Sequence, residues 1–415
     1  LFVTKLGWAA GSVLKEEGIS KVLIGKDTRI SGYMFESALQ AGFISAGMDV
    51  TMLGPLPTPG VSYLANSNNQ VGLVISASHN LFEDNGIKFF NKDGQKFSNE
   101  LERRIETKLT QDMVAVESIN LGKASRMNDA QGRYIEFCKS SFTNLDLNGL
   151  SILLDCANGA TYSVAPKVFS ELGANVDTIA ASPDGININQ NCGSTSPDTL
   201  KEAITKGSYD LGIAFDGDGD RILIVNSDGE VLDGDDILYI LSKTIPDDSG
   251  VVGTLMTNKA LEVYFQNEGI QFSRADVGDK YVLQSLVQKS WFLGGEPSGH
   301  IICLDSAPTG DAIIAALKLL SAIKANEFSI ERSLEGFKKF PQTLINLKVD
   351  NPNKIIVSDK FWERVTEIEY QLGEDGRVLI RPSGTEPLIR IMVESEDSST
   401  SENLCNSLAD LAQTI

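Results

Sequence analysis

One order of elements occurs three times along this chain, and it restricts the fold more than any other feature. An apolar strand, a helical stretch, a glycine turn and a second strand lead on to a further strand that ends in an unusual loop. The three copies begin with KVLIGKDT, LSILLDCANG and GVVGTLMTN, and Gly47, Gly173 and Gly269 stand where left-handed helix caps are expected. Such alternation is typical of α/β units around mainly parallel sheets. We therefore predict three related α/β domains.

The last stretch of the chain has a different pattern. TLINLKVD and RVLIRPSGTEPLIRIMVES resemble strands, and a helical segment follows them. This predicts an α/β protein with three mixed-sheet domains and a smaller C-terminal α+β domain, at residues 1–125, 126–232, 233–340 and 341–415. Ligands bind beyond the carboxyl ends of strands in open α/β sheets. The three unusual loops are therefore expected to converge on one cleft.

Charge and composition exclude several classes of protein. The formal net charge of −20 argues against nucleic acid or an anionic membrane as a partner, because phosphate groups require clustered Lys and Arg. No apolar run reaches the roughly 20 residues that span a bilayer. The five scattered cysteines form no CxxC pair, which indicates reduced thiols in a cytoplasmic protein. The chain lacks an initiator Met, so we expect its natural N-terminus to lie upstream.

The strongest local signal is DLGIAFDGDGDRILIV, in which Asp216, Asp218 and Asp220 alternate with glycine after an apolar strand. Three carboxylates this close repel one another, and a hard divalent cation relieves the repulsion. An EF-hand loop would need Gly and Glu at the positions of Arg221 and Ser227. We predict a Mg²⁺ site instead. Because Mg²⁺ usually accompanies phosphate, Arg221 could face a phosphate or orient a carboxylate.

A second loop, SASHN, ends the strand VGLVI and contains a candidate nucleophile. Beside a Mg²⁺ site, Ser78 is a candidate phosphoryl carrier, because a phosphoserine would offer charged oxygens to the metal. His79 either orients the loop, donates to phosphate, or is a structural histidine bonded to backbone. Lys88 follows closely and could transfer protons. In GKDTRISG, Arg29 either faces phosphate or caps a helix.

Two further loops suit a phosphorylated sugar. In GGEPSGHI, Glu296, Ser298 and His300 alternate with small or turn-forming residues, and such a set could bind sugar hydroxyls, although an ordinary turn is the alternative. In RPSGTEPLIR, guanidinium groups, hydroxyls and a backbone N–H form a donor set for phosphate. We call these residues the phosphate set: Arg381, Ser383, Gly384, Thr385 and Arg390.

These four loops, in this order, resemble the α-D-phosphohexomutases over essentially the whole chain. The resemblance implies that family's four-domain architecture. It implies that Ser78 is phosphorylated and is a metal ligand together with the three aspartates. Lys88 and Arg29 then lie near the transferring phosphoryl group, and Lys88 and His300 are proton-transfer candidates. Glu296 and Ser298 would contact the sugar, and the phosphate set would hold its other phosphate.

Within the family, VISASHN, DNGIKFF and FDGDGDR are most similar to the members that act on glucosamine phosphates. This implies an isomerase that interconverts glucosamine 6-phosphate and glucosamine 1-phosphate through a 1,6-bisphosphate, for UDP-N-acetylglucosamine synthesis. It also implies one Mg²⁺ per subunit, a bisphosphate activator and a homodimer through the first domain. Leu81 and Pro297 depart from the usual residues of their loops, and the usual N-terminal GTDGIRG is absent.

Three alternatives stay open. A mutase for glucose or mannose phosphates would share every motif except details of the sugar loop. A phosphatase of the haloacid dehalogenase type would use Asp216 as nucleophile and Asp218 as acid/base, but it expects Thr or Val where Asp220 stands, and it leaves Ser78 unexplained. A non-enzymatic sugar-phosphate binder would need neither the metal nor Ser78.

Overall fold

The computed structural model describes residues 1–349, 351–382 and 387–415. Its described strands form four separate sheets, of five, five, four and three strands. Each sheet with its helices is called a unit below, and the units are numbered in chain order. The first three sheets contain both parallel and antiparallel pairs, whereas the pairs of the fourth are antiparallel. This confirms the predicted fold class.

The first unit has the strand order β4-β3-β1-β2-β5. Its strands are β1 (Lys21–Lys26), β2 (Asp49–Pro55), β3 (Val71–Ile75), β4 (Ile87–Phe90) and β5 (Ala124–Arg126). Its helices are α1 (Phe2–Glu16), α2 (Ser31–Ser45), α3 (Thr58–Ser67) and α4 (Asn99–Leu109), with the 3-10 turn η1 (Ser118–Asn120). Every residue of β3 is buried, and β3 pairs in parallel with β1 and antiparallel with β4. The loop with Ser78 therefore leaves the carboxyl end of an interior strand.

The second unit has the strand order β10-β9-β8-β6-β7. Its strands are β6 (Ser151–Asp155), β7 (Asn175–Ile179), β8 (Leu211–Phe215), β9 (Ile222–Asn226) and β10 (Val231–Leu232). Its helices are α5 (Ala130–Ser140), η2 (Ala160–Ser163), α6 (Ala165–Glu171) and α7 (Asp198–Lys206). The acidic loop connects the fully buried β8 to its antiparallel neighbour β9.

The third unit has the strand order β12-β11-β13-β14. Its strands are β11 (Gly250–Thr254), β12 (Gln271–Ala275), β13 (Leu293–Gly295) and β14 (Ile301–Cys303). Its helices are α8 (Gly234–Ser242), α9 (Lys259–Glu268), α10 (Asp279–Lys289), α11 (Ala312–Ile323), η3 (Lys324–Asn326) and α12 (Ile330–Leu334). The predicted sugar loop is the turn of the β13–β14 hairpin.

The fourth unit has the strand order β15-β17-β16 and its own apolar core. Its strands are β15 (Gln342–Lys348), β16 (Gly376–Pro382) and β17 (Leu388–Ser395), and its helices are α13 (Pro352–Ile356), α14 (Asp359–Leu372) and α15 (Ser398–Gln413). Arg377 donates to the carbonyl oxygens of Leu255 and Thr257 (both 2.8 Å), and the Lys259 N–H donates to Glu394. These bonds attach the fourth unit to the third.

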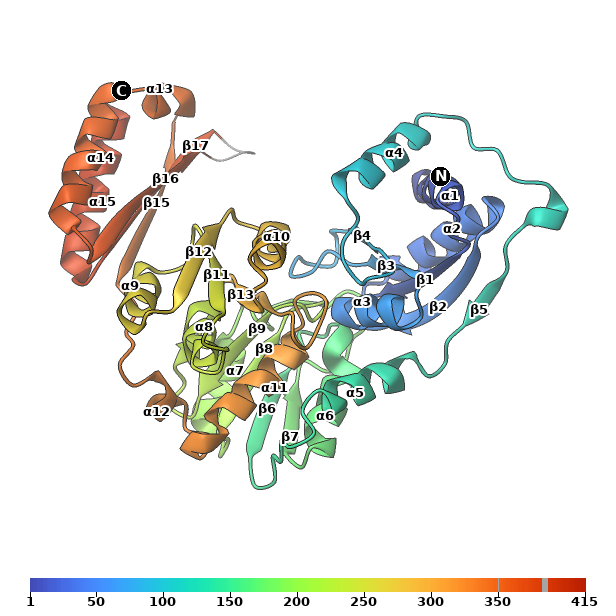
Figure 1. Cartoon of the computed structure of the whole chain (residues 1–415), viewed down its shortest axis with the longest axis horizontal. Coiled ribbons are helices and arrows are strands. Elements are labelled where there is room, and N and C mark those ends of the chain that lie inside the picture. Colours follow the sequence, from blue (N-terminus) through green and yellow to red (C-terminus); the bar gives the residue numbers. More distant parts are fainter. Residues whose placement is uncertain (350, 383–386) are drawn as a thin grey trace.

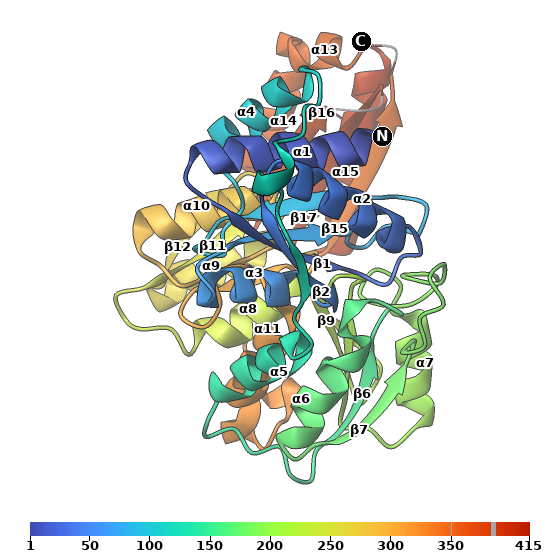
Figure 2. The same cartoon turned by 90° about the vertical axis from the view of Figure 1, so that its right-hand side faces the viewer.

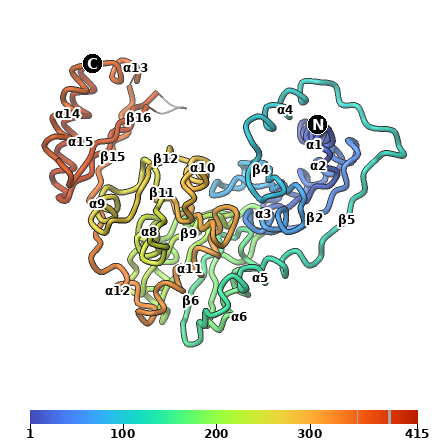
Figure 3. The backbone as a smooth tube through the Cα atoms, in the orientation of Figure 1, coloured from blue at the N-terminus to red at the C-terminus, as the bar shows by residue number. Residues whose placement is uncertain are grey.

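The first and fourth units lie on opposite sides of the second and third (Figure 1). A long connection carrying η1 and β5 runs along the outside of the first unit and enters α5 (Figure 3). Helix α5 lies between α3 of the first unit and α6 of the second (Figures 1 and 2). Among the described residues, no helix has the length and apolar character needed to cross a membrane.

The three predicted glycine caps are also present. Gly47, Gly173 and Gly269 have φ of 82°, 105° and 70°, in the left-handed region where glycine has no steric penalty. Each follows the helix that connects two parallel neighbours of its sheet, namely α2, α6 and α9. The order that recurs in the sequence thus corresponds to one similar strand–helix–strand segment in each of the first three units.

Candidate active site

The loop after β3 presents Ser78 to the second unit. Ser78 has a backbone φ of 51°, in the left-handed region that residues other than glycine seldom adopt. Its N–H donates to Oγ of Ser76 (3.0 Å), and its own Oγ donates to Oδ2 of Asp216 (2.7 Å). Ser78 and Asp216 follow strands of two different sheets, β3 of the first unit and β8 of the second. The structure therefore brings the candidate nucleophile directly to the acidic loop.

Asp216, Asp218 and Asp220 form a compact buried triad, in which one carboxylate oxygen from each lies within 4.8 Å of the others. Burial, together with the charges of Asp220 and Asp218, raises the pKa of Asp216 well above its ordinary value. Among the described residues, Oδ1 of Asp218 and Oδ1 of Asp220 accept no hydrogen bond. Buried carboxylate oxygens without partners are costly unless a cation is present. This donor set fits a hard divalent metal ion.

Lys88 of β4 neutralises part of the triad. Its Nζ lies 2.7 Å from Oδ2 of Asp218 and 3.1 Å from Oδ2 of Asp220. Burial alone would lower the pKa of Lys88, but these carboxylates outweigh that effect and raise the pKa above its ordinary value. The lysine is therefore an ammonium ion, placed to hold a proton at the site.

His79 and Arg221 face the same group of charges. Burial, and then the positive charge of Arg221, lowers the pKa of His79, so its imidazole is neutral near pH 7. The Arg221 N–H donates to Oδ1 of Asp216 (3.1 Å). Among the described residues, Nδ1 of His79 is buried without a partner. The neutral imidazole of His79, beside the triad, can donate a hydrogen bond from one ring nitrogen and accept one at the other.

The sugar loop places its residues unequally. Glu296 is 8% exposed, and its Oε1 accepts the N–H of Gly278 (2.9 Å). Ser298 is exposed. His300 is 4% exposed, and its Nδ1 lies 3.8 Å from Oδ1 of Asp220. A Cβ on Gly310 would come within 2.2 Å of Nε2 of His300, so backbone covers that side of the ring.

Arg29 binds the loop that carries Ser78, called the phosphoserine loop below after the role predicted for Ser78. The residue is 1% exposed, and its Nε donates to Oδ2 of Asp27 (2.9 Å). Its terminal nitrogens donate to three carbonyl oxygens of the loop, those of Ser78 (3.2 Å), Asn80 (2.9 Å) and Leu81 (2.5 Å). These bonds are neither of the two roles expected from the sequence, a phosphate contact or a helix cap. The guanidinium instead holds the backbone that carries Ser78.

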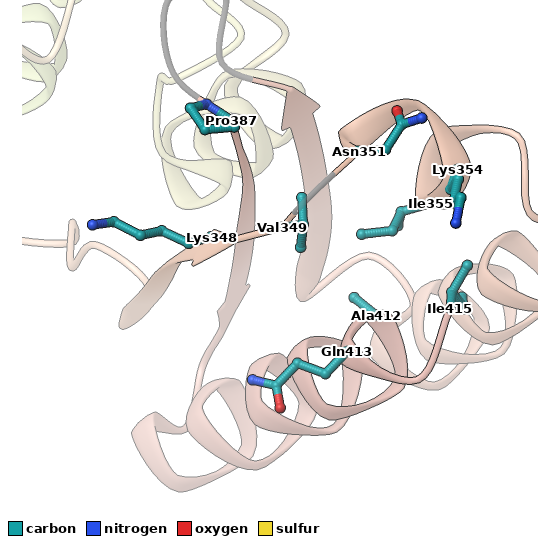
Figure 4. Close-up of a pocket in the computed structure, with 9 residues that line it drawn as sticks. All are labelled: Lys348, Val349, Asn351, Lys354, Ile355, Pro387, Ala412, Gln413 and Ile415. Atoms are coloured by element: carbon teal, nitrogen blue, oxygen red, sulfur yellow. The ribbon is translucent and has the colours of Figure 1, made fainter.

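Two residues of the phosphate set, Arg381 and Arg390, lie in the described part of the chain. Arg381 and Arg390 stand directly opposite each other on β16 and β17, in the fourth unit. Ser383, Gly384 and Thr385 lie outside the described residues. A hollow of about 570 Å³ in the fourth unit lies near the end of β15, α13 and the end of α15 (Figure 4). Among the described residues, none of the predicted site residues lines it.

Two residues that the sequence analysis missed join the loops together. Thr58, at the start of α3, donates its Oγ1 to Oδ2 of Asp218, and its N–H donates to the Asp218 carbonyl oxygen (2.9 Å). Asn189 donates to the carbonyl oxygens of Ser78 (2.9 Å) and Asn80 (2.8 Å). The polar segment GININQNCG after β7 was a signal for Asn189, since it too follows a strand. Thr58 stands in LPTPG, which gives only a helix start.

Comparison with known proteins identifies the family. Four family models match this chain, those of phosphoglucomutase/phosphomannomutase alpha/beta/alpha domain I at residues 1–114, domain II at 132–229, domain III at 233–340 and the C-terminal domain at 344–411. The chain belongs to the phosphoglucomutase/phosphomannomutase family. The resemblance to phosphohexomutases found in the motifs is thereby confirmed.

Individual members of the phosphoglucomutase/phosphomannomutase family agree with this assignment. A phosphoglucosamine mutase of Aeromonas salmonicida is 52% identical over 414 residues, which cover 98% of this chain and 93% of that protein. A family protein of Burkholderia thailandensis has the same fold, with a TM-score of 0.84, 22% identity and coverage of 99% and 93%. An Aspergillus fumigatus N-acetylphosphoglucosamine mutase, solved with GlcNAc-6P and magnesium, has a TM-score of 0.68, 17% identity and coverage of 85% and 91%.

Proposed function

We propose that this chain is an isomerase that interconverts glucosamine 6-phosphate and glucosamine 1-phosphate. The phosphoryl group passes through phospho-Ser78 and glucosamine 1,6-bisphosphate. The observation that carries the proposal is the 2.7 Å bond from Oγ of Ser78 to Asp216, because it places a hydroxyl nucleophile at a buried acidic triad. The 52% identity to a relative named phosphoglucosamine mutase supports glucosamine as the sugar.

The residues of the triad, with an oxygen of phospho-Ser78, would hold one Mg²⁺. Its fit rests on the buried oxygens of Asp218 and Asp220 that accept no bond among the described residues. When bound, Mg²⁺ supplies positive charge that stabilises a transferring phosphoryl group. Bound Mg²⁺ would also offset the burial and the charges of Asp220 and Asp218 that together raise the pKa of Asp216.

The transfer can be written with all atoms in balance. The bond from phosphorus to Oγ of Ser78 breaks, the bond from phosphorus to sugar O1 forms, and the proton of O1 ends on Oγ. Lys88, whose ammonium lies against Asp218 and Asp220, relays this proton: it gives one of its own protons to Oγ as the phosphorus–Oγ bond breaks, and it regains a proton from O1. The bisphosphate then turns over, and O6 returns its phosphoryl group to Ser78 by the same exchange in reverse. Free glucosamine 1,6-bisphosphate activates the enzyme by phosphorylating Ser78.

The other predicted residues bind the sugar phosphate. Glu296 and Ser298 contact sugar hydroxyls. His300, which lies beside Asp220, is the second candidate for proton transfer. The phosphate set of the fourth unit holds the phosphate that is not being transferred. Guanidinium groups such as Arg381 and Arg390 suit this role, because each can bind two phosphate oxygens at once.

The test is conversion of glucosamine 6-phosphate to glucosamine 1-phosphate, with Mg²⁺ and a glucosamine 1,6-bisphosphate primer. We expect turnover by the natural chain and by Ser37→Ala, which alters an exposed serine of α2, and none above background by Ser78→Ala. Parallel assays with glucose 6-phosphate and mannose 6-phosphate test the sugar. Equal turnover by Ser78→Ala would remove the phosphoserine, and faster turnover of glucose or mannose phosphate would replace the substrate.

A further inference from the structure

Asn189 of the second unit binds the phosphoserine loop of the first. Its two amide N–H groups are used on two carbonyl oxygens of that loop, those of Ser78 (2.9 Å) and Asn80 (2.8 Å). Only 5% of the residue is exposed. Water competes little with buried hydrogen bonds of this kind, so these bonds hold their acceptors in a defined orientation.

The position of Asn189 is itself well determined. Its φ is 59°, in the left-handed region that asparagine tolerates better than most residues. Its own N–H donates to the carbonyl oxygen of Ala157 (2.9 Å). Farther along the same loop, the N–H of Gly193 donates to Asp155 at the end of β6 (2.7 Å). The amide of Asn189 is therefore anchored to the sheet of the second unit.

The same two carbonyl oxygens also accept hydrogen bonds from Arg29 of the first unit. The backbone of the phosphoserine loop is thus held from both sides, by a guanidinium from its own unit and an amide from the next. The acidic loop passes directly beside this junction. A Cβ on Gly217 would lie 2.6 Å from both Nδ2 of Asn189 and the Ser78 carbonyl oxygen.

We propose that Asn189 is a positioning residue for phosphoryl transfer, which keeps the backbone of Ser78 in its left-handed conformation with Oγ directed at Asp216. This role of Asn189 rests on the proposed function of Ser78. A left-handed serine is strained, and such strain persists only where the surroundings determine the conformation. Arg29 alone would fix the loop to the first unit. Asn189 ties it to the unit that carries the acidic triad, so the two partners of phosphoryl transfer keep their register.

The matched variants are Asn189→Gly and Asn191→Gly. Both residues lie in one loop with left-handed φ (59° and 53°), so glycine relieves rather than adds backbone strain at each. Asn191 is exposed and serves as the control. A third variant, Asn189→Asp, keeps the side-chain shape but replaces both donors with a carboxylate that faces two carbonyl oxygens.

The first measurement is the single-turnover rate from phospho-Ser78 to glucosamine 6-phosphate with Mg²⁺. We expect both Asn189 variants to lose about tenfold or more relative to Asn191→Gly, because small displacements of a reacting group have effects of this size. The KM for the sugar should stay within about twofold of the control, because Asn189 binds the loop and not the substrate. If Asn189→Gly does not fold, the isosteric Asn189→Asp decides.

The second measurement is hydrogen exchange of residues 77–82 in the unphosphorylated protein, and it needs no catalysis. Asn189→Gly should speed exchange in that segment, whereas Asn191→Gly should not. An unchanged transfer rate in the Asn189 variants, or a loss that appears only as a higher KM, would overturn the proposal. If the natural chain transfers no phosphoryl group to the sugar, the proposed function fails, and the exchange result still decides whether Asn189 holds the loop.

Discussion

Oγ of Ser78 donates a 2.7 Å hydrogen bond to Oδ2 of Asp216, although the two residues are 138 positions apart and follow strands of different sheets. The bond joins the carboxyl end of β3 to the carboxyl end of β8. Neither unit contains the whole site by itself. The geometry of the reaction centre therefore depends on how the first and second units are docked.

Metal binding should depend on Asp218. We expect Asp218→Asn to weaken Mg²⁺ binding by about tenfold or more, because an amide oxygen replaces a charged ligand in a site that needs several. Isothermal titration of the unphosphorylated protein with Mg²⁺ measures the affinity. Asp410→Asn, an exposed change on α15, is the control. An unchanged Kd for Asp218→Asn would move the metal away from the triad.

Thr58 should support the acidic loop from the first unit. The isosteric change Thr58→Val removes a hydrogen bond to the buried carboxylate of Asp218, and bonds to charged groups contribute about 1.5 to 3 kcal/mol. We expect the urea midpoint to fall accordingly, and kcat to fall with it. Thr51→Val, which removes a contact between exposed hydroxyls of β2 and β5, should change neither. Equal behaviour of the two variants would show that the Thr58 bond has no net effect.

Arg29 should act through the loop and not through the substrate. Arg29→Lys keeps the charge but has too few fixed donors for Asp27 and three carbonyl oxygens. We expect kcat to fall by about tenfold or more with little change in the KM for glucosamine 6-phosphate. The exposed Arg133 of α5 gives the matched control, Arg133→Lys. A rise in KM with unchanged kcat would instead make Arg29 a substrate contact.

Asp311 should make stability fall as pH rises. Burial raises its pKa from 3.8 to about 6, although the N–H groups of Ile314 and Ile313 and the hydroxyl of Tyr134 all donate to it. The folded chain therefore binds the proton more tightly than the unfolded chain. Its contribution to the free energy of unfolding is complete below about pH 4 and is lost as pH passes about 6, a change of about 3 kcal/mol.

Urea unfolding at pH 4.5 and pH 7.5 measures this effect as the difference between the natural chain and Asp311→Asn. The asparagine cannot ionise, and it still accepts as the cap of α11. The natural chain should lose stability relative to the variant as pH rises between these values. Parallel changes in the two proteins would mean that the carboxylate of Asp311 is already well compensated by its three partners.

The parts of the site that lie within one loop could be predicted from the sequence. The acidic triad is recognisable because the spacing of Asp216, Asp218 and Asp220 brings three carboxylates together without any contribution from distant parts of the chain. Ser78 follows from its place at the end of an apolar strand. The first three units could likewise be predicted from the repeated order of strand, helix and glycine, and the fourth from the change of pattern that follows them.

The contacts between units could not be predicted in this way. Arg29 was expected to face phosphate or cap a helix, and it binds three backbone carbonyl oxygens, whose directions depend on the path of a loop about 50 positions away. Asn189 meets the Ser78 carbonyl oxygen across 111 positions. Hydrogen bonds to backbone leave no residue type to recognise on the accepting side, so no motif marks the pair.

The placement of the sugar loop on its own hairpin has a consequence for how such enzymes diverge. Glu296 and Ser298 stand in the turn between β13 and β14, whereas Ser78 and the acidic triad lie in loops that follow strands of two other sheets. If this turn contacts the sugar as proposed, mutations in it, including at Pro297, can alter which hexose is accepted while Ser78 and the acidic triad stay unchanged. The sugar specificity of such an enzyme can therefore evolve while its phosphoryl-transfer reaction stays the same.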